Sequence, residues 1–432
     1  MKCHYACRSA EHLMERRKFL GTVAGIAGAG MAGAGTVGMP GVVQAAMPEL
    51  AAKQKHILIV WLAGGLSQLE SWDPKPKTDT GGPFRAIPTS VPGTHISELL
   101  PYTAKQMHHL SIVRSIDTKE NDHGKGAYCM KTGRRQEPVA DYPHLGAVGA
   151  KLLSPVDSPL PGHIHVQAGG SGGSRDDSAF LGPRYASISL GGGPPRNTAL
   201  PEHVTPEADA RRHAFRMQAN DHFARRRRSA QSDAFVSSFD QARQLMERRD
   251  VFDNTKEPQR DVERYGSHEF GQNCLLARRL IEQGISCVQV THTNYDTHHE
   301  NFDFHIEQLG EFDQTFATLV ADLVDRGLWD STLLVVMSEF GRTPKINNRF
   351  GRDHWGRAWS VALGGCGIQP SAVIGKTNDN GTEVADRQVD HGHLFHTYLQ
   401  AVGVDSTEKF DAGGRSIPMA DPAAEPITEL LA

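Results

Sequence analysis

The sequence is short of the features that mark several common classes of protein. Its formal net charge is only −4 over 432 residues, so the overall balance does not indicate a partner of strongly opposite charge. Six cysteines are present without a Cys-X-X-Cys pair, so their spacing gives no thiolate metal motif. Beyond residue 46 no segment is long and apolar enough to cross a membrane. These absences leave a globular chain that is long enough for one large core or for two domains.

Four of the cysteines lie beyond residue 46 and are flanked by apolar residues. This setting predicts buried free thiols, while a disulfide remains the alternative in an oxidising compartment. The four residues are Cys129, Cys274, Cys287 and Cys366.

Residues 1–46 have the pattern of an export signal. Arg16-Arg17-Lys18-Phe19-Leu20 precedes a weakly hydrophobic Gly/Ala run, and Val43-Gln44-Ala45 is a small-residue cleavage pattern. A membrane anchor is the alternative, but glycine contributes little transfer free energy, so the run is a poor anchor. We expect twin-arginine export to the periplasm or beyond, with no transmembrane segment left after the signal is removed. Such cargo is folded before export and often carries a metal or cofactor.

Apolar runs and helical spacing predict an α/β fold for residues 47–432, as one domain. In the last third, helices and strands alternate, which implies right-handed crossovers and a mainly parallel central sheet flanked by helices. The predicted strands are 56–62, 111–115, 163–166, 285–290, 333–337 and 359–363, and the predicted helices include 121–135, 274–281, 304–326 and 393–402.

A strongly charged helical pattern over about 206–250 predicts an inserted helical arm. It contains Arg225-Arg226-Arg227-Arg228, which is a candidate polyanion site. A solvated helix face is the better explanation, because no aromatic residues interleave with the arginines as a nucleic-acid platform would need. We therefore expect no nucleic-acid partner.

The most informative segment is 332–359. Leu333-Leu334-Val335-Val336-Met337 reads as a buried parallel strand, Glu339 follows it, and a Gly/Pro/Asn-rich loop then brings His354. Ligands of open α/β sheets bind at the carboxyl ends of the strands. Carboxylate and imidazole are both ligands for divalent cations, although a solvated glutamate and a hydrogen-bonded histidine would give the same pattern.

A second polar cluster, 294–301, follows the strand 285–290. We expect Asp296 and His298 to meet Glu339 and His354 at one edge of the sheet and to bind a divalent ion such as Zn²⁺, Mn²⁺ or Fe²⁺, with positions open for water or substrate. His299 points elsewhere in an extended chain. The alternative is a polar loop that caps the next helix through Asn301 or Asp303.

A third segment, 122–134, places His123 and Lys125 between glycines at a helix start. Free backbone N–H groups and these two side chains could hold an anion, and a surface helix start with a solvated lysine is equally compatible. Ser67, in the turn after the first strand, is a weak candidate nucleophile. Asp73 is a further candidate to reach the site from the same loop.

Motifs across the whole mature chain resemble a bacterial family known as domain of unknown function 1501. The carrying residues are the twin-arginine leader, Gly64-Gly65-Leu66-Ser67-Gln68, Trp72-Asp73-Pro74-Lys75-Pro76, Thr132-Gly133-Arg134, Arg264-Tyr265-Gly266, Phe270-Gly271-Gln272, Leu275-Leu276-Ala277-Arg278-Arg279-Leu280, Tyr295-Asp296-Thr297-His298, Ser338-Glu339-Phe340-Gly341-Arg342-Thr343-Pro344 and Gly351-Arg352-Asp353-His354-Trp355. The resemblance implies an alkaline phosphatase-like fold, related to sulfatases and cofactor-independent phosphomutases. In those enzymes metal ligands follow parallel strands.

The sequence departs from that superfamily at three places. Phe340 stands where relatives carry a metal-binding histidine, Gly64-Gly65 where they carry metal-binding aspartate, and the nucleophile position falls near His123. The resemblance therefore implies at most one well-supplied metal and a direct attack by water.

The sequence thus predicts an exported, metal-dependent hydrolase of a phosphate or sulfate ester, either a small molecule or borne on a polymer. Asp296, His298, Glu339 and His354 would bind the metal. Arg342 and Lys125 would neutralise substrate oxygens, with His123 also at the anion. The alternative is a non-catalytic binding or scaffolding protein that keeps the fold, which the lost aspartate and nucleophile positions favour.

Overall fold

The computed structural model describes residues 54–432 apart from 139, 156–157, 175–176, 192–194, 196–197 and 228–229. Residues 48–432 form one compact unit. The predicted export signal lies outside the described residues. Among the residues described, no helix has the length and apolar character needed to cross a bilayer.

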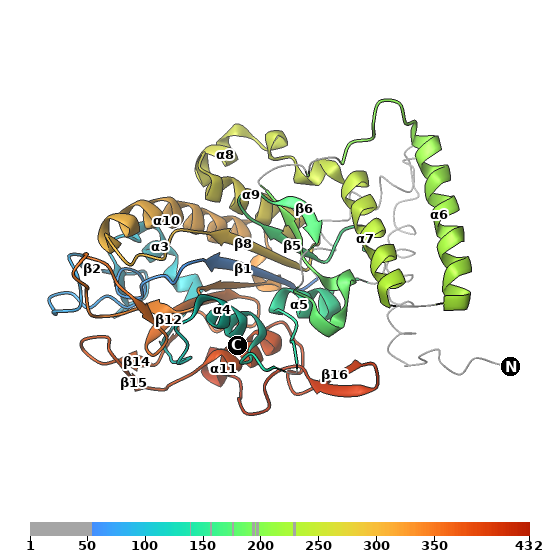
Figure 1. The fold of residues 1–432 in the computed structure, drawn as a ribbon. Helices are drawn as coiled ribbons and strands as arrows, with labels where there is room; N and C mark the ends of the chain where they lie inside the picture. Colours follow the sequence, from blue (N-terminus) through green and yellow to red (C-terminus); the bar gives the residue numbers. More distant parts are fainter. Residues whose placement is uncertain are drawn as a thin grey trace, which may run out of the picture. The chain divides into compact units, whose positions relative to one another are not determined.

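A nine-stranded sheet forms the centre of the fold (Figure 1), in the order β13-β4-β12-β9-β1-β8-β5-β7-β6. Parallel pairs join β9 to β1, β1 to β8, β8 to β5 and β5 to β7. The mainly parallel sheet that the alternating pattern predicted is therefore confirmed. Its strands are β1 (His56–Leu62), β4 (Leu110–Ile116), β5 (His163–Val166), β6 (Ser171–Ser174), β7 (Ile188–Leu190), β8 (Cys287–His292), β9 (Thr332–Met337), β12 (Trp359–Gly365) and β13 (Val373–Ile374).

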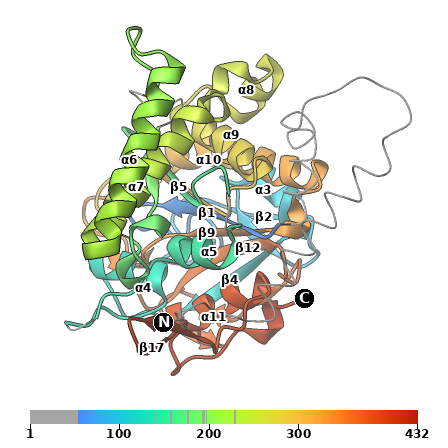
Figure 2. The same ribbon diagram turned by 90° about the vertical axis from the view of Figure 1, so that its right-hand side faces the viewer.

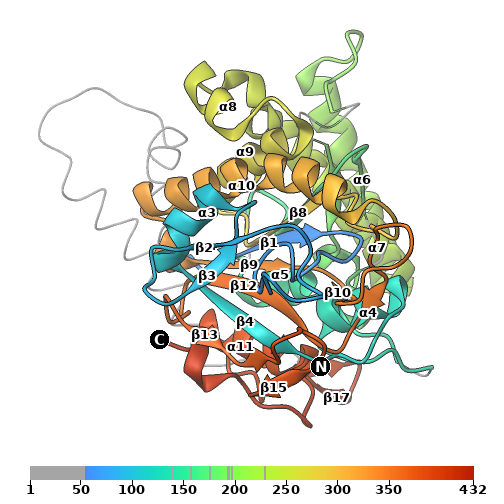
Figure 3. The same ribbon diagram turned by 90° about the vertical axis from the view of Figure 1, so that its left-hand side faces the viewer.

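Helices cover both faces of this sheet (Figure 3), and β1 shows why. Leu58, Val60 and Leu62 belong to one apolar cluster, with α3, α9 and α10, whereas Ile57 and Ile59 belong to another, with α4, α5 and α11. A strand that is buried on both faces reads as a continuous apolar run. The helices are α3 (Pro101–Gln106), α4 (His123–Thr132), α5 (Leu145–Leu153), α8 (Gln259–Tyr265), α9 (Glu269–Glu282), α10 (Asn301–Asp325) and α11 (His391–Ala401).

The α6–α7 arm consists of α6 (Pro206–Arg227) and α7 (Ala230–Glu247), which lie side by side in Figures 1 and 2. They fall in the segment where the sequence predicted an inserted helical arm. Of the four-arginine run, the side chains from Arg226 onward lie outside the described residues.

One strand of the central sheet differs from the simplest expectation for an alternating chain. Strand β12 is antiparallel to β9 and to β4, because the chain returns from β9 through residues 338–358 without a crossover helix. The four cysteines of the described chain are buried and free, as expected from their apolar flanks. The remaining strands form small two-stranded sheets: β2 (Ala86–Pro88) with β3 (His95–Ser97), β10 (Gly341–Arg342) with β11 (His354–Trp355), β14 (Lys376–Thr377) with β15 (Val384–Asp386), and β16 (Lys409–Ala412) with β17 (Arg415–Pro418).

Candidate metal centre

The carboxyl ends of β8, β1 and β9 lie next to one another, since β1 pairs in parallel with both of the other strands. The loop after β8 carries Asp296 and His298, and Glu339 follows β9. Both clusters were predicted at one edge of the sheet, but the two strands are not direct neighbours. Strand β1 separates them, so its turn, Gly64-Gly65, lies between the two polar loops.

The return from β9 to β12 adds His354 to this edge. Residues 341–342 pair with 354–355 as β10 and β11, and Arg342 is directly opposite His354 in the register. His123 comes from a third direction, as the first residue of α4, which Asp122 caps by accepting from the Lys125 backbone N–H.

Three imidazoles meet Asp296 in what we call the His–Asp cluster (His123, Asp296, His298 and His354). The Nε2 atoms of these histidines lie 3.4, 3.2 and 3.1 Å from oxygens of Asp296, in that order. The Nε2 atoms of His298 and His354 are 2.9 Å apart. The cluster faces solvent, because the side chains of Asp296 and His123 are 48% and 40% exposed.

The other ring nitrogen of each histidine contacts an oxygen acceptor. Nδ1 of His123 is 2.7 Å from Glu339 Oε1, Nδ1 of His298 is 2.7 Å from Asp353 Oδ1, and Nδ1 of His354 is 2.7 Å from the Asn121 carbonyl oxygen. These acceptors favour the tautomer with the proton on Nδ1, which leaves the Nε2 lone pair directed at Asp296. Metal-binding histidines are oriented in this way by a carboxylate or carbonyl.

Three lone pairs that face one carboxylate repel it unless positive charge lies among them. The Arg342 guanidinium, which contacts Asp296, supplies part of that charge, and a proton on one imidazole or a bound cation would supply more. Burial lowers the pKa of His354, which favours its neutral form, whereas the hydrogen bond to Glu339 raises the pKa of His123.

The spacing of the donor atoms fits one divalent cation. Adjacent ligand atoms at about 2.1 Å from an ion lie about 3.0–3.4 Å apart, which matches the 2.9–3.4 Å separations in the cluster. The potential ligand atoms of His123, Asp296 and His354 all lie within 4.8 Å of one another. His298 is not part of that group, so the geometry offers two imidazoles and one carboxylate, a donor set that suits Zn²⁺, Mn²⁺ or Fe²⁺.

Arg342 holds Asp296 from the protein side. Its side chain is fully buried, and Nη2 donates to Asp296 Oδ1 at 2.5 Å. Other guanidinium hydrogens go to the carbonyl oxygens of Gly64, Gly65 and Arg352. Partial burial alone would raise the pKa of Asp296, but the hydrogen bond and charge of Arg342 lower it to about 2. Asp296 is therefore ionised at neutral pH.

The sequence predicted that Glu339 binds the metal directly, but in the structure its carboxylate contacts the cluster through His123. Its Oε1 is 2.7 Å from His123 Nδ1 and accepts from the Gly64 N–H at 2.9 Å, and its Oε2 accepts from the Ser338 hydroxyl at 3.1 Å. The carboxylate thus orients His123 through Nδ1. His123 joins the donor set instead, which the anion-holding role predicted for it did not include.

The other candidates from the sequence have separate environments. The Lys125 side chain is exposed on the first turn of α4, and His299 packs against the Phe304 ring, 5.7 Å between centroids. Ser67 is fully buried. Asp73 accepts from the Thr377 hydroxyl at 2.5 Å and pairs with Lys75 at 3.1 Å.

The alternative in which Asn301 or Asp303 caps the helix after β8 is wrong, because neither residue is the N-cap. The N-cap of α10 is Glu300, in the left-handed region at φ 48°, and its side chain makes no capping hydrogen bond. Asn301 is already the first helical residue and accepts from the Thr297 hydroxyl at 2.6 Å. Phe340, where the resemblance implied a lost ligand, is buried beside the cluster, with its ring centroid 4.4 Å from that of His354.

Gly64 fixes how closely the turn after β1 approaches the loop of Asp296. Its φ is +116°, and a Cβ there would meet the backbone nitrogen of Asp296. We expect Gly64→Ala to displace Asp296 and to weaken metal binding by about 10- to 100-fold, measured by titration calorimetry.

Gly93→Ala is the matched control, because Gly93 also has a positive φ (+82°) but no neighbouring atom lies within 4 Å of the place that an added Cβ would take. It should cost about 1 kcal/mol in unfolding free energy from backbone strain and leave metal binding intact. Equal metal affinities in the two variants would contradict the role given to Gly64.

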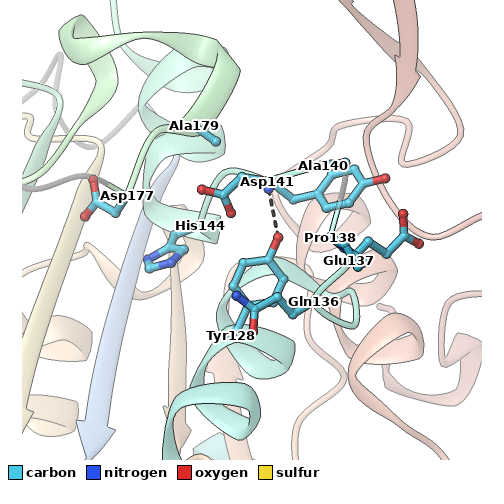
Figure 4. Close-up of a pocket in the computed structure, with 10 residues that line it drawn as sticks. Tyr128, Gln136, Glu137, Pro138, Ala140, Asp141, His144, Asp177 and Ala179 are labelled. Atoms are coloured by element: carbon cyan, nitrogen blue, oxygen red, sulfur yellow. Dashed lines mark hydrogen bonds between the residues drawn. The ribbon is translucent and has the colours of Figure 1, made fainter.

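A separate cavity of ≈ 580 Å³ lies beside α4 (Figure 4). Tyr128 forms part of its wall and accepts from the Tyr142 backbone N–H at 2.9 Å, the dashed line in Figure 4. Its other lining residues are Gln136, Glu137, Pro138, Ala140, Asp141, Tyr142, His144, Asp177 and Ala179, none of which belongs to the His–Asp cluster.

Solved structures similar to this chain include a protein in the alkaline phosphatase superfamily from Vibrio parahaemolyticus, at 13% identity and TM-score 0.40, with 88% of this chain and 71% of that chain covered. A sulfatase from Pseudoalteromonas sp. has 12% identity and TM-score 0.41, with 91% and 75% covered. Alkaline phosphatase from the Antarctic bacterium TAB5 has 13% identity and TM-score 0.35, with 81% and 98% covered.

No curated protein matches the sequence. The family model described as "Protein of unknown function (DUF1501)" matches residues 54–431, nearly all of the described chain. The chain therefore belongs to the DUF1501 family.

Proposed function

We propose that this protein is an exported, metal-dependent hydrolase of phosphate or sulfate esters. The observation that carries the proposal is the convergence of three Nε2 atoms and one ionised carboxylate at the solvent-facing carboxyl ends of β8 and β9. His123, Asp296 and His354 would hold the ion, and His298, whose Nε2 lies 2.9 Å from that of His354, would lie beside it. A bound divalent ion supplies Lewis-acid chemistry, which lowers the pKa of water and polarises an ester oxygen.

The chain's own residues prepare this site in two ways. Glu339, Asp353 and the Asn121 carbonyl fix the three rings, so that their Nε2 atoms need no reorientation. Arg342 keeps Asp296 ionised and in place. Four of its five N–H donors are engaged by protein oxygens, which leaves little capacity for substrate. Of the two cations that the sequence suggested for the substrate anion, this leaves Lys125, which is exposed two residues after His123.

Attack by water is the reaction that best suits the cluster. Ser67 is buried, Thr297 donates its hydroxyl to Asn301, and burial raises the pKa of the Cys129 thiol to about 11. In the proposed step the water oxygen bonds to phosphorus or sulfur, the bond to the alcohol oxygen breaks, and the alcohol leaves with a proton. Export rests on the twin-arginine pattern of residues 16–20.

One observation favours a non-catalytic scaffold as the second candidate. The Arg342 guanidinium already balances the charge of Asp296 at 2.5 Å, so the fold does not require an ion to keep this carboxylate in place. Such a protein would retain the cluster as a structural hydrogen-bond network.

Metal removal separates the two candidates. We expect purified protein to contain about one equivalent of transition metal and to hydrolyse aryl phosphate or aryl sulfate. Chelation should abolish hydrolysis, and Zn²⁺, Mn²⁺ or Fe²⁺ should restore it. Ion at 100 times its dissociation constant should also raise the unfolding free energy by about 2.7 kcal/mol. A metal-free protein whose unfolding does not respond to any of these ions would favour the scaffold.

A further inference from the structure

Solvent-exposed apolar side chains are concentrated on the α6–α7 arm. Ten large apolar residues of the described chain are exposed, and half of them lie on these two helices. A monomeric protein rarely exposes a group of large apolar residues without a binding function. The five are Phe215, Met217, Phe223, Phe235 and Phe239.

The four phenylalanines form what we call the arm face (Phe215, Phe223, Phe235 and Phe239), each between 50% and 73% exposed. Phe215 and Phe223 are eight residues apart on α6, and Phe235 and Phe239 are four apart on α7, so each pair lies along one side of its helix. The two helices contact each other beside these pairs, because the Arg216 guanidinium of α6 lies 4.6 Å from the Phe239 ring centroid. Arg216 also pairs with Asp240 at 3.1 Å.

Positive charge accompanies this apolar face. Residues 211–225 of α6 contain four arginines and one carboxylate, Asp221, whereas the start of α6 carries Glu207 and Asp209, and α7 carries Asp233, Asp240 and Glu247 with one arginine, Arg243. The arginines are Arg211, Arg212, Arg216 and Arg225, and the sequence continues with three more. A second copy of this part of α6 would bring like charges together, so charge complementarity here favours an anionic partner.

We infer that the arm face docks on an anionic phospholipid membrane surface. Phenylalanine rings enter the boundary between headgroups and acyl chains, while arginines on the same helix contact lipid phosphates. A duplex nucleic acid would satisfy the arginines alone, because phosphate contacts give no gain for exposed phenylalanines. The bilayer interface offers an apolar layer to the phenylalanines and phosphate groups to the arginines of the same arm.

Vesicle flotation tests this inference with the chain that begins at residue 48, which forms a compact unit. The protein should float with vesicles of phosphatidylcholine and phosphatidylglycerol, and not with phosphatidylcholine alone, and high salt should release it. The double variant Phe215→Ser/Phe223→Ser should lower the partition coefficient by about tenfold or more. Arg211→Gln/Arg212→Gln should weaken binding and its salt dependence.

The matched control is Tyr102→Ser/Ile306→Ser, which removes two exposed apolar side chains outside the arm and should bind as the unaltered chain does. Phe235→Ser/Phe239→Ser provides a second test if the first double variant unfolds early. Equal flotation of the arm variants and the control would overturn the inference, as would absence of binding to anionic vesicles at low salt. A dimer in solution that the phenylalanine variants abolish would assign the face to a second copy instead.

Discussion

Replacing Asp296 by asparagine is expected to reduce ester hydrolysis and metal affinity by at least about 100-fold each, since even residues that only orient metal ligands contribute 10- to 100-fold. The change keeps the shape of the side chain but removes the negative charge that faces the three Nε2 atoms. Asparagine still offers an oxygen to Arg342, so the fold should persist. Metal content by mass spectrometry and initial rates with an aryl ester measure the two losses.

Two further variants test whether the loss depends on the position of the carboxylate. Asp353→Asn removes the carboxylate that orients His298 at 2.7 Å and should cause a smaller loss, about 10-fold. Asp379→Asn changes an exposed aspartate outside the cluster and should change neither quantity. If Asp296→Asn retained full metal content and activity, the His–Asp cluster would not be the metal centre.

Replacing Arg352 by methionine is expected to lower the unfolding free energy by about 3–5 kcal/mol. Arg352 and Glu70 are both fully buried, and Arg352 Nη2 donates to Glu70 Oε1 at 2.7 Å. The same guanidinium donates to the carbonyl oxygens of Thr80, Thr343 and Pro344. Methionine would leave the Glu70 charge buried without its partner. Urea unfolding followed by circular dichroism measures the change.

The dependence on pH gives a second readout for the same pair. Burial would raise the pKa of Glu70, but the Arg352 charge, followed by that of His305, leaves it below its ordinary value. A carboxyl group with a lowered folded-state pKa stabilises the protein above its unfolded pKa and loses that contribution as pH falls. Without Arg352, burial would instead raise the pKa of Glu70, so the cost of Arg352→Met should be largest at neutral pH and should shrink as pH falls and Glu70 takes up a proton.

Two comparisons separate the buried pair from general effects of charge. Arg85→Ala removes a guanidinium that is 84% exposed and 2.9 Å from Glu98, so it should cost only about 0.5 kcal/mol. The double variant Glu70→Leu/Arg352→Met should recover much of the loss, because apolar residues can replace a buried ion pair. A cost for Arg352→Met no larger than that of Arg85→Ala would contradict the importance of the pair.

The parts of the fold that depend on local pattern were predictable. The strand 333–337 and the carboxylate that follows it were found because a run buried on both faces is continuously apolar. The direction of β12 was not, since it depends on a return loop that contains no helix. Likewise Asp296, His298 and His354 could be grouped by their positions after strands, whereas the role of His123 depends on how α4 approaches the sheet. Only the fold shows that Glu339 contacts His123 through Nδ1.

The members of the His–Asp cluster come from distant parts of the sequence, which determines when the cluster can form during folding. Its members come from residues 123, 296–298 and 354, so the site exists only when segments more than two hundred positions apart have docked. Contacts of such long sequence separation form late. An ion bound at the cluster would therefore indicate that the chain is fully folded. A protein exported in the folded state would cross the membrane with that ion already bound.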